Sequence, residues 1–165
     1  MTVENQIITI HSLNVTTLIL DLDGVLITTP TWKSDDMHAD GYSDFNVSCV
    51  SNLNELLSSH DFEIWLSSTR RTKKSLTEFN SIFRNRNISK EIVGFLPVYN
   101  DCSNRKEEVE KFITENNLTC FLIIDDDKSL KSMKQEYQNR LVSTDLTLGF
   151  NKDKLYEAIL MLNKT

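Results

Sequence analysis

The sequence predicts an α/β fold of the Rossmann-like, doubly wound kind, with a mostly parallel sheet in a single domain over residues 1–165. Strand-like apolar runs alternate with segments of helical periodicity, which is the pattern of βαβ units. The run 17–22, TLILDL, is apolar almost throughout, as expected for a strand covered on both faces. No repeat, low-complexity tract or Pro/Gly-rich linker marks a domain boundary.

The first half of the chain alternates in this way from the strand at 17–22 onward. The stretch 28–44, TTPTWKSDDMHADGYSD, is polar and irregular, and predicts a long loop. The segment 62–68, FEIWLSS, predicts the second strand. Between them a helix is predicted over 45–59, because apolar residues recur on one face: Val47, Val50, Leu53, Leu56 and Leu57.

The second half continues the alternation. Apolar residues at helical spacing predict one helix around Leu76, Phe79, Ile82 and Phe83, and another over 105–116 with Val109, Phe112 and Ile113 inward. Further strands are predicted at 91–98, 120–127 and 140–144, and further helices at 129–138 and 152–162. The segment 6–12, QIITIHS, predicts an extra edge strand.

Composition and charge narrow the class of protein. A charged fraction of 25% and a hydrophobic fraction of 39% are typical of a globular domain, and no run approaches the roughly 20 apolar residues of a membrane span. The net charge of −6 argues against a generally basic nucleic-acid-coating surface but leaves a local basic patch open. Cys49, Cys102 and Cys120 form no disulfide or zinc pattern, so we expect a cytoplasmic protein without a membrane partner. The oligomeric state stays open.

Two acids close the first predicted strand. Asp21 and Asp23 are followed at once by Gly24, and Asp-Gly between apolar runs is also a strong β-hairpin signal. A hairpin would explain Asp23 and Gly24 but not Asp21, because an ionised acid on a buried strand is costly unless it is paired or binds a metal. The pattern therefore favours a functional site.

A second acidic cluster follows the strand at 120–127. The apolar run FLII ends in Asp125, Asp126 and Asp127; alone, this cluster would indicate a solvated turn with Asp127 capping a helix. Parallel strands bring their carboxyl ends together, however, and several carboxylates in one crevice repel one another unless a cation holds them. Oxygen ligands of this kind suit Mg²⁺.

Between the acidic clusters, Ser67 and Ser68 place two hydroxyl groups at the end of the second predicted strand, although such a pair is often only a turn or helix cap. Lys106 stands near the start of a predicted helix, where a cation is unfavourably placed against the helix dipole. Its position therefore suggests a negatively charged partner.

These motifs, in this chain order, resemble those of the haloacid dehalogenase-like (HAD) hydrolase superfamily: Asp-x-Asp-Gly-Val-Leu after an apolar strand, a strand-end Ser, a Lys, and an apolar strand ending in acids. More narrowly, WLSSTRR, IIDDD and LVSTDLTLGF resemble the small HAD domains associated with RNA-repair proteins. The resemblance implies a HAD fold and a Mg²⁺-dependent phosphatase acting on a phosphomonoester, for which a nucleic-acid or nucleotide end phosphate is a candidate.

The resemblance also implies roles for individual residues. Asp21 would be the nucleophile that forms an aspartyl-phosphate, and Asp23 the general acid and base, with its backbone carbonyl also reaching the metal. Ser67 would bind the phosphoryl oxygens. Lys106 would offset negative charge, with the adjacent Arg105 as the alternative. The metal ligands would be drawn from four residues: Asp21, Asp23, Asp125 and Asp126.

A basic cluster stands out in this acidic chain: Arg70, Arg71, Lys73 and Lys74. It can be a solvated helix face, or a basic lip in which Ser68, Arg70 and Arg71 bind substrate. The loop 28–44 is short for a folded cap domain, so we expect little or no cap and an open site. Of the aromatic residues Trp32, Tyr42 and Trp65, Trp32 is the best candidate for stacking on a base, and Trp65 is expected in the core.

Four other classes of protein share some of these features. The chain has no GxxxxGK[ST] motif, which sets a P-loop NTPase aside. In a phospho-accepting receiver domain the hydroxyl and Lys would follow the acceptor acid, whereas here they precede the last acids. A non-catalytic HAD-like binding module and a small-metabolite phosphatase both stay open, because a fold does not define a reaction.

Overall fold

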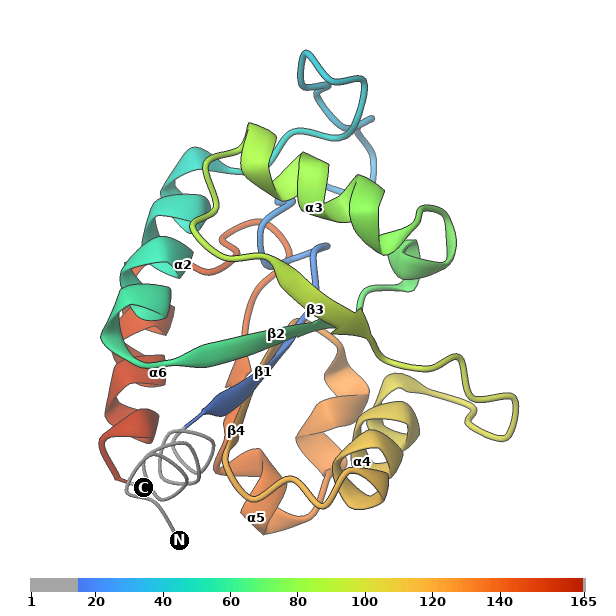
Figure 1. Cartoon of the computed structure of the whole chain (residues 1–165), viewed down its shortest axis with the longest axis vertical. Helices are drawn as coiled ribbons and strands as arrows, with labels where there is room; N and C mark the ends of the chain where they lie inside the picture. Colours follow the sequence, from blue (N-terminus) through green and yellow to red (C-terminus); the bar gives the residue numbers. More distant parts are fainter. Residues whose placement is uncertain (1–14, 165) are drawn as a thin grey trace, which may run out of the picture.

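The computed structural model describes residues 15–164, so the strand predicted at 6–12 lies outside the described part of the chain. Its centre is a five-stranded sheet in the order β3-β2-β1-β4-β5, and every neighbouring pair is parallel (Figure 1). The strands are β1 (Thr16–Leu20), β2 (Phe62–Leu66), β3 (Ile92–Phe95), β4 (Phe121–Asp125) and β5 (Leu141–Ser143). The predicted parallel sheet is confirmed.

Helices cover both faces of this sheet, as Figure 1 shows. One face carries α2 (Val47–Ser59), α3 (Leu76–Asn85) and α6 (Lys152–Leu162). The other carries α4 (Arg105–Glu115), the 3₁₀ turn η2 (Lys128–Ser132) and the one-turn helix α5 (Gln135–Gln138). A hydrophobic core lies on each face of the sheet. Alternate residues of β1 contribute to the two cores, because Leu18 and Leu20 face α2 and α6 while Ile19 faces α4.

Local sequence explains where the helices begin. Asn46 caps α2 by accepting from the backbone N–H groups of Ser48 and Cys49, and Ser75 opens α3 in a capping box with Glu78. Val47 differs from its prediction, because it is 81% exposed at the first turn of α2 rather than part of the buried face.

The helix predicted over 129–138 is interrupted. Residues 128–132 form η2, Met133 is extended, and α5 begins only at Gln135. Leu130 and Met133 are both buried, and a spacing of three places them on one side of a turn with three residues per turn. The periodicity of 3.6 was therefore the wrong assumption for this segment.

The segment between β1 and α2 is irregular. Of the residues that the structure describes, those from 21 to 46 form no helix or strand of a cap domain, and contain only turns and isolated bridges. No hairpin follows β1, since both of its partners are parallel strands. The carboxyl edge of the sheet is thus covered by a loop alone.

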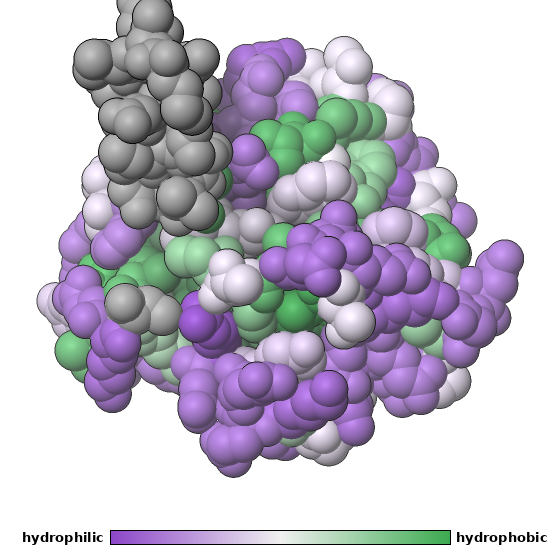
Figure 2. All heavy atoms as spheres, turned by 60° about the horizontal axis from the view of Figure 1, so that its bottom comes forward, coloured by the Kyte–Doolittle hydropathy of each residue, from purple (hydrophilic) through white to green (hydrophobic). Residues whose placement is uncertain are grey.

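The surface is largely hydrophilic on the face that Figure 2 brings forward, with smaller hydrophobic patches between the polar side chains. None of the helices formed by residues 15–164 has the length and apolar character that crossing a membrane requires. Cys49, Cys102 and Cys120 are all free thiols.

Candidate active site

The predicted acids lie where the strand order of the sheet changes direction. The chain moves from β1 to β2 on one side and returns to β4 on the other, which makes the carboxyl ends of β1 and β4 a topological switch point. Leu20 of β1 pairs with Ile124 of β4, and the backbone N–H of Asp21 donates to the carbonyl of Ile124 at 3.0 Å. Asp21 and Asp125 therefore leave neighbouring strands at the same level.

Three carboxylates converge at this point. Asp21, Asp125 and Asp126 each offer an oxygen, and these oxygens lie within 4.8 Å of one another. Asp125 is completely buried and Asp21 nearly so, at 0% and 6% exposure, whereas Asp126 is half-buried. The arrangement is an oxygen-only cluster at the end of two strands, which suits a hard divalent cation.

The electrostatics of the cluster are unfavourable without such a cation. Burial raises the pKa of Asp21, against the lowering effects of the Arg105 charge and the Leu22 backbone N–H. Burial and the charge of Asp21 raise the pKa of Asp125 well above its usual range. Burial and the charges of Asp21 and Asp23 raise the pKa of Asp126 to about 6. The positive charge near these three carboxyl groups is therefore too small to keep their pKa values in the usual range.

Gly24 makes room for the third acid. Its φ of +71° belongs to the left-handed region, and a Cβ at this position would overlap Asp126 Oδ2. Thr144 holds the turn from the other side, because its hydroxyl donates to the Gly24 carbonyl at 2.6 Å. The Asp126 side chain can therefore take its position only because the residue that turns the chain after Asp23 has no side chain.

Arg105, the alternative to Lys106, is the cation that the structure brings to the cluster. Its Nη1 donates to Asp125 Oδ2 at 3.2 Å, and the side chain is only 6% exposed. Lys106, predicted for this role, lies on another side of α4; within residues 15–164 its side chain has no hydrogen bond or ion pair, and only its backbone N–H contacts Ser129. Of these two neighbours, the structure brings Arg105 rather than Lys106 into contact with the acidic cluster.

The two serines after β2 have different surroundings. Ser67 stands beside Asp21, since its backbone N–H donates to the Leu20 carbonyl at 2.8 Å. Its hydroxyl is buried and has no hydrogen-bond partner among the described residues, so a donor is available next to the carboxylates. Ser68 is also buried, and its hydroxyl caps the 3₁₀ turn η1 (Thr69–Thr72) by accepting from the Arg70 N–H. This capping hydrogen bond accounts for a serine at position 68 without any contact to a substrate.

Asp23 is close to the three converging carboxylates but is not one of them, and it faces Arg70. Arg70 Nε donates to one carboxylate oxygen at 2.8 Å and Nη2 to the other at 2.7 Å. The same guanidinium contacts Asp35 at 2.9 Å and the hydroxyl of Ser43 at 3.0 Å. The carboxylates of Asp23 and Asp35 raise the pKa of Arg70. Asp35 and Ser43 were not predicted, because one sequence gives no sign of which loop residues reach an arginine.

The predicted basic lip is smaller than expected. Arg71 is buried, and its guanidinium donates to the carbonyls of Ser67, Ser68, Leu96 and Pro97 and to Glu108. It fastens the ends of β2 and β3 and presents no surface to a ligand, which corrects its prediction as a substrate-binding residue. Lys73 is exposed and Lys74 half-buried, both before α3 rather than within it.

The aromatic residues also separate into two groups. Trp32 is 84% exposed in the loop after β1. Trp65 packs against Phe112, with ring centroids 5.2 Å apart, as expected for a residue that contributes to the core. Tyr42 packs edge-on against Phe79 with Arg70 and Lys74 near its ring. Of the three, Trp32 alone offers an open ring face.

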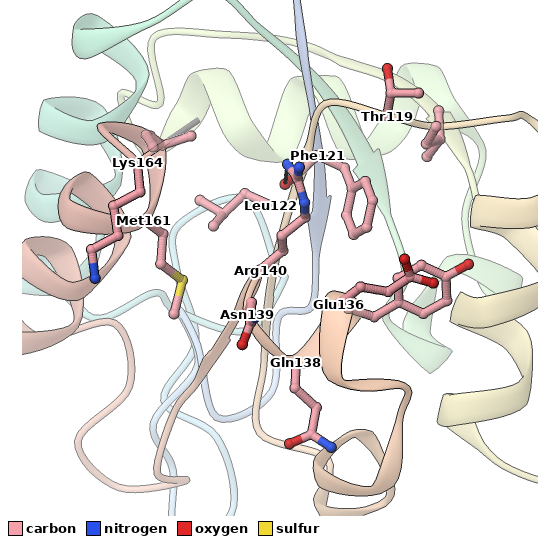
Figure 3. Close-up of a pocket in the computed structure, with 12 residues that line it drawn as sticks. Thr119, Phe121, Leu122, Glu136, Gln138, Asn139, Arg140, Met161 and Lys164 are labelled. Carbon is pink, nitrogen blue, oxygen red and sulfur yellow. Dashed lines mark hydrogen bonds between the residues drawn. The ribbon is translucent and has the colours of Figure 1, made fainter.

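A separate cavity of about 910 Å³ lies at the opposite edge of the sheet (Figure 3). It is lined where β4 and β5 begin and where α6 ends, by residues that include Phe121, Arg140 and Met161. None of the converging carboxylates contributes to it. Volume alone therefore does not identify the active site, and the chemistry of the side chains points to the other edge.

A parallel sheet in this order, with paired acids after β1 and further acids at the end of β4, defines the class: this is a haloacid dehalogenase-like domain, and residues 15–164 form no cap domain. The model of one family, described as the HAD domain in Swiss Army Knife RNA repair proteins, matches residues 17–155, and the chain belongs to this family. The chain matches none of the curated proteins with which it was compared. Family membership confirms the predicted resemblance and supports a HAD-type hydrolase in general.

Proposed function

We propose that the protein is a Mg²⁺-dependent phosphomonoester hydrolase that acts through an aspartyl-phosphate on Asp21. The observation that carries the proposal is the convergence of Asp21, Asp125 and Asp126 within 4.8 Å at the switch point of the sheet. Asp23, two residues after Asp21, supplies a second carboxylate outside this group, so separate acids are available for attack and for proton transfer.

The donor set fits Mg²⁺. The three converging acids offer only oxygen, and the ion pair from Arg105 cannot balance three negative charges. Burial and, for Asp125 and Asp126, the charges of neighbouring acids raise the pKa values of these carboxyl groups, and a bound cation would oppose both effects. Asp21, Asp125 and Asp126 would hold the ion, with the Asp23 carbonyl as a further oxygen. When bound, Mg²⁺ would offset the charge of these acids and of the phosphoryl group.

The reaction then follows from the residues in place. An Asp21 oxygen attacks phosphorus, the bond from phosphorus to the leaving oxygen breaks, and Asp23 donates a proton to that oxygen. In the second half Asp23 takes a proton from water, the water oxygen attacks phosphorus, and phosphate leaves with Asp21 restored. The Ser67 hydroxyl is available to a phosphoryl oxygen, and the ion pair from Arg105 would hold the Asp125 side chain in position.

For the substrate we propose a nucleic-acid or nucleotide end phosphate. Three observations support this choice: the family is described by its occurrence in RNA repair proteins, a loop rather than a cap domain covers the site, and Trp32 is exposed in that loop. We also propose a cytoplasmic location, which the three free thiols support.

The test is phosphate release from p-nitrophenyl phosphate and from 3′- and 5′-phosphorylated oligonucleotides, with Mg²⁺ and with EDTA. We expect release that requires Mg²⁺ and falls by at least about 10³-fold in Asp21→Asn, because the nucleophile is lost. Asp36→Asn is the control, since Asp36 is exposed and pairs only with Lys33. Absence of Mg²⁺-dependent release from a panel of phosphorylated metabolites and these probes would instead favour a binding module.

A further inference from the structure

We propose that Arg70, Asp35 and Ser43 form a clamp, here called the acid clamp, that positions the Asp23 carboxylate for proton transfer to the leaving group. Arg70 and the two loop residues are thus positioning residues that act through Asp23. The inference rests on the proposed function, because it concerns the step in which Asp23 acts as general acid.

The fork between Arg70 and Asp23 fixes the plane of the carboxylate. Nε and Nη2 of Arg70 donate to the two different oxygens of Asp23, at 2.8 and 2.7 Å. A paired contact of this kind restricts orientation as well as distance, which a lysine with a single ammonium group cannot do. Each carboxylate oxygen has two acceptor positions, so the fork leaves one position on each oxygen of Asp23 unoccupied by Arg70.

The loop holds the other side of the guanidinium. Arg70 Nη2 also donates to Asp35 Oδ2 at 2.9 Å, and Nη1 donates to Ser43 Oγ at 3.0 Å. Ser43 Oγ in turn donates to Asp35 Oδ2 at 2.6 Å, and this hydrogen bond is the largest cause of the lowered pKa of Asp35. All three nitrogens of Arg70 are therefore used, and the guanidinium has one well-defined orientation.

Both ends of the clamp are anchored to the core. On one side η1 follows β2 directly, and its cap at Ser68 holds the Arg70 backbone. On the other side the buried Arg86, at the end of α3, donates to the carbonyls of Tyr42 and Ser43 at 3.2 and 2.8 Å. Because the acid clamp is fixed at both ends, it can hold the Asp23 carboxylate in one position.

Asp23 needs such support. Its side chain is 40% exposed and stands near the charges of Asp21 and Asp126, which repel it when it is ionised. Without Arg70 it would turn toward water, away from the leaving oxygen. The clamp does not contact Asp21 or Asp125, so its loss should impair proton transfer more than attack on phosphorus.

The test compares p-nitrophenyl phosphate with phenyl phosphate, which are similar in size but differ in how much the leaving oxygen needs a proton. Positioned general acids contribute about 10²–10⁴-fold, and more when the leaving group is poor. For Arg70→Ala and Asp35→Asn we expect kcat on phenyl phosphate to fall at least about tenfold more than kcat on p-nitrophenyl phosphate. Arg70→Lys should behave like Arg70→Ala, because the fork is missing.

Matched controls are Arg84→Ala, an exposed arginine paired with Glu91, and Asp36→Asn, an exposed neighbour of Asp35. Both should keep the wild-type kcat ratio between the substrates. The double variant Asp23→Asn with Arg70→Ala should be no slower than Asp23→Asn alone, because the clamp acts only through Asp23. If Arg70→Ala does not fold, the kcat ratio of Asp35→Asn, a nearly isosteric substitution, tests the acid clamp in its place.

Two different failures can be told apart. If the wild-type protein hydrolyses neither aryl phosphate with Mg²⁺ and no other phosphomonoester of the panel, the proposed function is wrong and the clamp falls with it. If the wild type is active but Arg70→Ala and Asp35→Asn change both substrates equally, or raise only KM, the clamp is wrong and the function stands; a KM effect alone would make Arg70 a phosphate-binding residue.

Discussion

Two independent features of the structure require glycine at position 24. Its φ is +71°, and the carboxylate of Asp126 occupies the space that a Cβ would need. Gly41 has a similar φ of +80° but nothing within 4 Å of a Cβ. A comparison of the two glycines can therefore distinguish backbone strain from crowding of Asp126, a proposed metal ligand.

We expect Gly24→Ala and Gly41→Ala each to lose about 1–3 kcal/mol of stability from the left-handed backbone. Only Gly24→Ala should also weaken stabilisation by Mg²⁺, because it displaces Asp126. Thermal unfolding of both variants over a Mg²⁺ titration measures this. Equal Mg²⁺ responses in the two variants would contradict the proposed role of Asp126.

For individual residues, the sequence predicts where the acidic side chains of the site lie better than where the basic side chains lie. Asp21, Asp125 and Asp126 could be grouped because acids that follow buried parallel strands must meet at one edge. Arg105 and Lys106 are neighbours about 100° apart on a helix, so only one of them can face the site, and the sequence does not show how α4 is rotated against the sheet. Arg71 was predicted on the surface because a sequence does not reveal which backbone carbonyls need a donor.

Among the elements, the loop 28–44 depends most on contacts distant in sequence. Arg86 donates to both oxygens of Asp40, at 2.7 and 3.0 Å, and to nearby carbonyls of the loop. These bonds hold the pKa of Asp40 well below its usual value. Composition correctly predicts a loop here, but the arginine that fastens it lies outside the loop, in a segment that periodicity assigns simply to a helix end.

Asp40→Asn should lower stability at neutral pH by about 1–3 kcal/mol, because Arg86 is buried and loses a charged partner. Since folding lowers the pKa of Asp40, its contribution is present above the ordinary value of 3.8 and is lost as pH falls through the folded pKa. The stability difference between wild type and variant should therefore shrink in acid, as denaturant unfolding at several pH values would show.

Asp101→Asn is the control for this experiment. Asp101 also has a lowered pKa from an ion pair, with Lys111, but it is exposed and water screens the pair. Its replacement should change stability little at any of these pH values. If the effect of Asp40→Asn stays constant down to the most acidic pH, the loss comes from packing rather than charge.

For the whole molecule, the parallel sheet concentrates uncompensated negative charge at one edge. The order of elements predicted this edge, because parallel strands bring their carboxyl ends to the same edge of a sheet. The sequence did not predict the strand order, in which β1 lies beside β4. The break between η2 and α5 was not predictable from the same pattern, and neither was the cavity at the opposite edge. Both depend on how distant segments pack rather than on local periodicity.

Mg²⁺ should therefore stabilise the whole fold. At a Mg²⁺ concentration of 100 times Kd the gain is about 2.7 kcal/mol, and EDTA should abolish the corresponding rise in Tm. Asp126→Asn should lose most of this gain. Asp127→Asn should keep it, because Asp127 caps η2 and is outside the cluster. A Tm insensitive to Mg²⁺ in wild type would contradict the metal site.

The pairing of β1 with β4 also has a consequence for synthesis on the ribosome. Asp21 is made about 100 residues before Asp125, and the two meet only when the later strand joins the sheet. At a translation rate of about 5–20 residues per second, the nascent chain carries Asp21 for roughly 5–20 seconds before Asp125 exists. The proposed metal ion could thus act only on the late stage of folding in which β4 joins β1.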